Sequence, residues 1–220
     1  MTERIPLFPL HIVLFPGLVL PLHIFEERYR TMIQGLLDGP GPRRFGIVAI
    51  ELGHEVGAGA ARELASVGCM ADIHEVTQRP DGRFDLLTVG STRFTMLGPV
   101  TGEAYLRADV EFLPDEAGAG AGAAADRVRR LFPAYRARLA GAGAEAAEPA
   151  ELPDDPVELS YLVAAATVLD RAEKQRLLAA EDAAARLAVL AEFLIRETRL
   201  LETMPTIPTS QFGQGGVNPN

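Results

Sequence analysis

The chain has 220 residues, 48% of them hydrophobic and 23% charged, which is ordinary for a soluble globular protein of one large domain or two small ones. Its formal net charge of −9 argues against sequence-independent binding to nucleic-acid phosphates. The single Cys69 excludes an internal disulfide. No apolar run approaches the roughly 20 residues of a membrane-spanning helix, and the N-terminus lacks a signal-peptide pattern. We therefore expect a cytoplasmic protein with no membrane contact.

The most hydrophobic stretch is the opening run from Arg4 to Arg30, RIPLFPLHIVLFPGLVLPLHIFEERYR. Four prolines interrupt it, and each prevents a helix from continuing and favours extended backbone in the preceding residue. The run therefore predicts irregular strands buried in a β-core. Residues 15–17, Phe-Pro-Gly, are typical of a turn, because glycine can adopt a positive φ.

After this run, the pattern predicts one helix and several short strands. Apolar residues at helical spacing predict an amphipathic helix over 25–37. Residues 54–63, HEVGAGAARE, are glycine-rich and predict a loop, and an Asp-Gly pair at 81–82 predicts a hairpin turn. Alternating or continuous apolar patterns predict strands over 44–51, 67–77, 84–89, 92–97 and 105–113. Together these elements favour a small, partly open β-barrel formed by residues 1–114.

Beyond residue 114 the composition changes, and strand patterns disappear. Residues 115–126, DEAGAGAGAAAD, are of low complexity and predict a linker. Residues 127–204 predict a helical bundle, because Asp155, Asp170 and Asp182 stand at N-cap positions before apolar periodic segments. Residues 205–220 predict a flexible tail. The expected fold class is thus α+β, with a β-domain that contains one helix followed by a C-terminal helical bundle.

A search for catalytic motifs finds none that is complete. The only lysine, Lys174, lies in AEKQRLL rather than in a phosphate-binding G-x-x-x-x-G-K-[ST] loop, and no G-x-S-x-G sequence occurs. The four histidines lack the spacings of a zinc site. We therefore expect no catalytic residue, no metal and no cofactor.

Exposed apolar surface is the remaining feature that could give the protein a binding function. Some of the opening aromatic residues could line an exposed groove for extended peptide, with two arginines nearby. The alternative is that these aromatic residues belong to the core and the arginines form structural ion pairs. The candidate peptide-binding residues are Phe8, Phe15, Phe25, Arg28, Tyr29 and Arg93.

Three ordered blocks of sequence resemble one known family. They are PLFPLHIVLFPGLVLPLHIFEERYRTMI, GCMADIHEVTQRPDGRFDLLTVGSTRFTML, and the helical stretch that contains EKQRLLAAEDAAARLAVLAEFL. Together they resemble the Lon-type substrate-binding domain, the N-terminal domain of Lon proteases and of its stand-alone bacterial relatives. The resemblance implies a PUA-like pseudo-barrel followed by helices. In full-length Lon proteases this domain engages substrates, and the ATPase and Ser-Lys protease domains lie downstream. Because this chain stops before either, the resemblance implies a stand-alone domain without catalysis.

We therefore expect a non-catalytic module that recognises unfolded or apolar-exposing polypeptide, in partnership with, for example, a protease or chaperone component. The module would be a monomer or a weak homo-oligomer. One alternative is an RNA-binding module, since other PUA-like barrels bind RNA, but the acidic charge argues against nucleic acid. Another is an unrecognised hydrolase, which would need His23 to face Glu26 or His74 to face Glu75 in a pocket.

Overall fold

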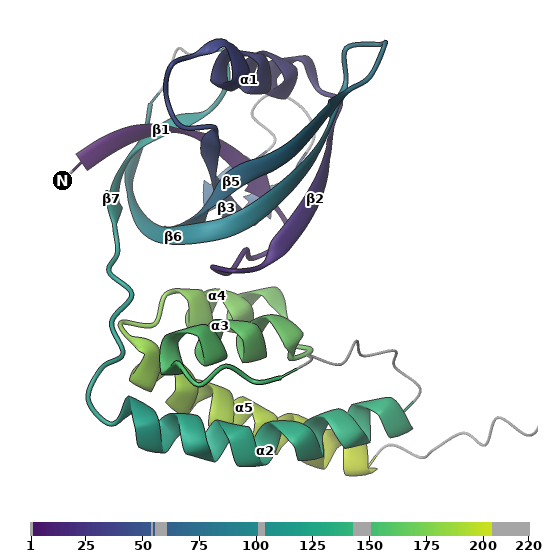
Figure 1. The fold of residues 1–220 in the computed structure, drawn as a ribbon, viewed down its shortest axis with the longest axis vertical. Helices are drawn as coiled ribbons and strands as arrows, with labels where there is room; N and C mark the ends of the chain where they lie inside the picture. Colours follow the sequence, from purple (N-terminus) through teal and green to yellow (C-terminus); the bar gives the residue numbers. More distant parts are fainter. Residues whose placement is uncertain (1, 54, 56–60, 101–103, 143–150, 204–220) are drawn as a thin grey trace, which may run out of the picture.

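A computed structural model describes residues 2–53, 55, 61–100, 104–142 and 151–203 of the protein. Within these ranges, strands and one helix occupy the first half of the chain, and four helices form a layered group beside one end of the β part (Figure 1). None of the helices described is long and apolar enough to cross a membrane. The predicted tail and most of the predicted loop at 54–63 lie outside the described residues.

The strands form a small barrel. Its pairings run from β1 to β7, β6, β5 and β3, and a parallel pairing of β3 with β1 closes the ring. Strand β2 pairs with the first part of β6, and β4 pairs with the last part of β3. The predicted β-barrel with a C-terminal helical part is therefore confirmed. The strands are β1 (Thr2–Leu10), β2 (Val19–Ile24), β3 (Arg44–Gly53), β4 (Ala61–Leu64), β5 (Val67–Gln78), β6 (Phe84–Val100) and β7 (Arg107–Phe112).

Helix α1 (Glu27–Asp38) covers one end of the barrel (Figure 1). It begins two residues later than its apolar pattern predicts. Its buried residues Tyr29, Met32 and Ile33 pack against Phe8 and Phe45 of the barrel, because the apolar positions fall on one side of the helix. These residues together form part of one hydrophobic cluster of the β part.

Strand β6 is longer than predicted. Two strands were expected over 84–89 and 92–97, separated at Gly90, whereas a single strand runs through both. A side chain at Gly90 would place its Cβ 2.2 Å from the carbonyl oxygen of Phe15. The glycine therefore allows two backbones to approach each other inside a strand and does not mark a turn.

The remaining helices are α2 (Ala121–Gly141), α3 (Pro156–Ala166), α4 (Arg171–Leu178) and α5 (Ala183–Thr203). The predicted caps are present, since the carboxylates of Asp155, Asp170 and Asp182 accept hydrogen bonds of 2.7–3.0 Å from first-turn amides of α3, α4 and α5. Each cap satisfies donors that a helix start leaves unpaired.

The low-complexity stretch at 115–126 is not a free linker, and this prediction is corrected. Helix α2 begins inside it at Ala121, because its alanines are strong helix formers. Gly118 and Gly120 have φ values of 78° and 81° and make the turn before the helix. The two carbonyl groups just before Gly118 accept hydrogen bonds of 2.9 Å from the first two amides of α5. The segment is thus fixed to the helical part.

A shared hydrophobic cluster joins the barrel to the helices. Phe15, Ala49 and Val67 from the β part belong to the same cluster as Tyr161 and many apolar residues of α2 to α5. The rings of Phe15 and Tyr161 lie 6.4 Å apart. The two parts therefore meet through buried apolar surface in addition to the covalent connection after β7.

Candidate functional site

The most exposed apolar part of the opening run lies along β2 and just after it. In β2, the odd-numbered residues face solvent and the even-numbered ones turn inward, ending with the fully buried Ile24. Val19 keeps 53% of its surface exposed, and Phe25, one residue past the strand, keeps 50%. In Figure 1, β2 forms the margin of the β part, and its neighbour there is β6. This margin, from Val19 to Phe25, is hereafter called the β2 edge.

The turn at residues 15–17 sets the position of the β2 edge. Gly17 has φ 79°, and its N–H donates to the carbonyl of Gly90 at 2.8 Å. The N–H of Gly90 in turn donates to the carbonyl of Leu18 at 2.9 Å. Two consecutive residues of the incoming strand thus face one residue of β6, which is a bulge with a left-handed glycine at its first position. The predicted turn is confirmed, and it fixes the pairing of β2 with β6.

A charged cluster lies beside the β2 edge. The Nδ1 atom of His23 lies 2.6 Å from Asp85 Oδ1, and Arg79 Nε donates to Asp85 Oδ2 at 2.6 Å. Both hydrogen bonds hold the pKa of the Asp85 carboxyl below its usual value, and the bond from His23 has the larger effect. The three residues line a surface depression of about 440 Å³. The ring of His23 also stacks with Phe25 at 6.2 Å between centroids, so Asp85 holds the imidazole against the exposed aromatic side chain.

The facing pairs required for a hydrolase do not form. His23 pairs with Asp85 instead of Glu26, whose carboxylate forms an ion pair with Arg28 at 3.1 Å. His74 and Glu75 are both exposed on β5, outside this depression. Within the described part of the chain, no three His, Cys, Asp or Glu side chains gather as metal ligands would.

Most of the predicted peptide-binding residues are buried, and their placement in an exposed groove is corrected. Phe8 and Tyr29 contact each other inside the barrel, with ring centroids 4.2 Å apart. Burial raises the pKa of Tyr29 to about 12. Phe15 is 1% exposed in the cluster shared with the helices. Alternation of apolar residues cannot tell a core aromatic side chain from an exposed one, so the sequence left both readings open. Only Phe25 presents its ring to solvent, and Arg28 lies partly buried over the Tyr29 ring, 4.4 Å from its centroid.

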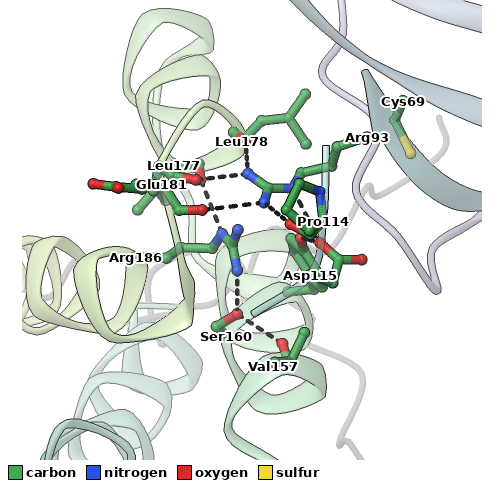
Figure 2. Close-up of polar contacts among 12 residues, drawn as sticks. Cys69, Arg93, Pro114, Asp115, Val157, Ser160, Leu177, Leu178, Glu181 and Arg186 are labelled. Atoms are coloured by element: carbon green, nitrogen blue, oxygen red, sulfur yellow. Dashed lines mark hydrogen bonds and ion pairs between the residues drawn. The ribbon is translucent and has the colours of Figure 1, made fainter. Parts of the chain in front are cut away.

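Arg93, the remaining predicted binding residue, is 1% exposed and connects the barrel to the helices. Figure 2 shows its guanidinium reaching from β6 to the turn between α4 and α5. Its Nη1 donates to the carbonyls of Leu178 at 2.9 Å and Ala180 at 2.6 Å. Its other nitrogens donate to the carbonyl of Pro114 at 3.0 Å and to the carboxylate of Asp115 at 3.1 Å. A planar, always charged guanidinium suits these several acceptors, and its charge lies at the C-terminal end of α4, where cations are favourable.

A second buried arginine, Arg186 of α5, completes this junction, and sequence reasoning missed its role. It donates to the carbonyl of Leu177 at 3.0 Å and to the hydroxyl of Ser160 at 2.8 Å (Figure 2). Its guanidinium lies 4.0 Å from the ring centroid of Tyr161. Burial, with the nearby charge of Arg93 as a smaller cause, lowers its pKa to about 10. In the sequence, the burial of Arg186 is indicated only by its position four residues before Leu190, which places it on the apolar side of the helix.

Comparison with known families gives one match over most of the chain. The model of the ATP-dependent protease La (LON) substrate-binding domain matches residues 4–196. Lon protease 2 of Desulfotalea psychrophila is 27% identical over 208 residues, which cover 92% of this chain and 26% of the protease. The Lon protease of Anaeromyxobacter dehalogenans is 27% identical over 214 residues, covering 96% of this chain and 25% of the protease. The chain thus spans about a quarter of the length of these curated relatives.

Two solved structures share the fold. A Lon N-terminal domain protein from Xanthomonas campestris superposes with a TM-score of 0.60 at 22% identity, covering 92% of this chain and 99% of that one. The N-terminal domain of the Mycobacterium avium complex Lon protease gives a TM-score of 0.64 at 20% identity, covering 88% and 98%. At these identities the likeness establishes the arrangement of barrel and helices.

Proposed function

Because the chain belongs to the family of ATP-dependent protease La (LON) substrate-binding domains, we propose that it binds polypeptide and performs no catalysis of its own. The observation that carries this proposal is the family match over residues 4–196, which includes both the barrel and the helices. The two buried arginines at the junction, Arg93 and Arg186, donate to main-chain carbonyls of α4, which supports a structural role for them.

The proposed ligand is a polypeptide segment that has lost its fold, or never had one, and exposes apolar side chains. The exposed side chains of Val19 and Phe25 support this ligand, because apolar surface gains free energy when another apolar group covers it. The net charge of −9 supports a protein ligand over a nucleic acid. Delivery of the bound polypeptide to a protease or chaperone component, in the cytoplasm, is part of the proposal.

The test is a fluorescence anisotropy titration at physiological salt with labelled α-lactalbumin that has been reduced and carboxamidomethylated, so that it stays unfolded. A labelled structured RNA is titrated in parallel. Saturable binding to the polypeptide alone is the expected result. Binding to RNA alone, weakening steeply with salt, would replace the proposal with nucleic-acid recognition.

Matched variants locate the contact. Val19→Asp and Phe25→Asp each place a charge on the β2 edge, and we expect both to weaken polypeptide binding because the bound segment would bury that charge. Leu200→Asp on α5 is the control, since Leu200 is similarly exposed at 47% but belongs to the helical layer away from the barrel (Figure 1). Equal weakening by all three variants would contradict a site at the β2 edge.

A further inference from the structure

Resting on the proposed function, we propose that bound polypeptide adds to β2 as an extended strand, paired through its main chain with the outward side of the β2 edge. In this mode the backbone supplies affinity for many sequences, and side chains beside it supply selectivity. The mode suits the proposed ligand, which is defined by its lack of a fold.

The register of β2 determines which main-chain groups are free for this pairing. Leu18 and Gly90 form a hydrogen-bonded pair through their main chains. In an antiparallel ladder, hydrogen-bonded pairs recur at every second residue. The even-numbered residues of β2 therefore bond to β6, and the odd-numbered ones direct their N–H and C=O groups away from it. Pro21 agrees with this register, because it has no N–H and occupies a non-bonded position opposite Leu87.

Nearly all main-chain groups on the outward side of β2 could pair with an added strand. Within the part of the chain that the structure describes, β2 pairs with β6 and with no other strand. Val19 and His23 each present one donor and one acceptor, and Pro21 presents an acceptor only. An added strand could thus form two hydrogen bonds at Val19, one at Pro21 and two at His23. Their spacing along the strand matches that of an extended main chain.

The side chains beside the edge indicate which segments fit. On the outer face, Val19 is exposed and is paired with the partly buried Val89 of β6. On the inner face, Leu20 and Leu22 are only partly buried at the border of the barrel core. An added strand would contact apolar side chains on both faces, so segments rich in apolar residues fit best.

A second copy of this chain is the competing occupant, and Pro21 argues against it. If two β2 edges paired antiparallel about Pro21, the Pro21 residues of the two copies would face each other. Neither has an N–H to donate, so the central pair of the ladder would form no hydrogen bond. Proline on an edge strand is a recognised way of limiting such self-pairing. An unfolded polypeptide supplies the donor that Pro21 can use.

Residue-resolved amide hydrogen exchange by NMR tests the pairing directly, with the whole chain and unlabelled reduced, carboxamidomethylated α-lactalbumin as the probe. We expect bound polypeptide to slow exchange of the Val19 and His23 amides at least tenfold, while the Leu20 and Leu22 amides, already bonded to β6, change little. Protection of other amides with Val19 and His23 unchanged would overturn strand addition. If exchange at these two amides instead slows as the concentration of this chain is raised without added polypeptide, the β2 edge pairs with a second copy. That result would also overturn the proposal.

A proline substitution provides an independent test. Val19→Pro removes an outward N–H that β6 does not use, and proline keeps as many side-chain carbons as valine. One net hydrogen bond corresponds to about a fivefold change in Kd, so we expect Val19→Pro to bind labelled polypeptide about fivefold more weakly than the wild-type chain. Val19→Ala keeps the N–H but loses two side-chain carbons, and it measures the side-chain contribution separately. Equal Kd values for Val19→Pro and the wild-type chain would refute strand addition but leave polypeptide recognition standing. Absence of binding by the wild-type chain would refute both proposals.

Discussion

Replacing Arg93 by methionine should strongly destabilise the protein, because its guanidinium is the main polar connection between barrel and helices. The substitution keeps much of the side chain's length but leaves the carbonyls of Leu178, Ala180 and Pro114 without the donor that satisfies them. Removing one partner from a buried charged network costs about 3–5 kcal/mol. That is a large share of the roughly 5–15 kcal/mol that stabilises a typical domain.

The assay is urea unfolding followed by circular dichroism at 222 nm, with Arg127→Met as the control. Arg127 is exposed on α2, so its replacement should change the free energy of unfolding by less than about 0.5 kcal/mol. Arg93→Lys should also destabilise, because a single ammonium cannot reproduce a planar fork that reaches five acceptors. A loss below about 1 kcal/mol for Arg93→Met would refute the role assigned to this residue.

Other predictions test local features of the fold and the site. Asp155→Ala should cost about 1 kcal/mol in urea unfolding, because it removes the α3 cap; an unchanged midpoint would contradict this. Gly68→Ala should lower the thermal midpoint by several degrees or prevent folding, since its Cβ would lie 2.4 Å from the Phe94 ring and 2.6 Å from the carbonyl oxygen of Ile47, and a wild-type midpoint would contradict this packing argument. Asp85 has a depressed folded pKa, so its contribution to stability is present above its unfolded pKa of about 3.9 and is lost as pH falls through the lower folded pKa. Asp85→Asn should therefore lower the thermal midpoint at pH 7, and its difference from the wild-type midpoint should shrink as the pH falls below about 3.9. A difference that stays constant with pH would contradict the ion-pair assignment.

Features controlled by local chemistry could be predicted from the sequence. The Asp155 and Asp170 caps depend on the few residues that follow them, and the turn before Gly17 depends on a proline and a glycine in adjacent positions. The alternation of apolar residues in 105–113 likewise corresponds to β7. These signals need no knowledge of distant partners.

Features controlled by distant contacts could not be predicted in this way. Gly90 looks like a strand break until Phe15, far away in the sequence, is placed against it. Phe15 and Phe25 are both aromatic residues in one apolar run, yet one is 1% and the other 50% exposed, because only one of them meets the helices. Arg93 belongs to the β part but its acceptors lie after residue 113. A boundary at residue 114 between two separately folding domains remains a prediction, and the shared cluster around Phe15 argues that the parts support each other.

The most direct test of polypeptide recognition compares two states of one polypeptide. Labelled, unfolded α-lactalbumin is bound to the wild-type chain, and either unlabelled unfolded or unlabelled native α-lactalbumin is added as competitor. The account predicts that the unfolded form displaces the label and that the native form, most of whose apolar side chains are packed inside its fold, does not. Equal displacement by both forms, or no saturable binding of the label at the outset, would contradict it.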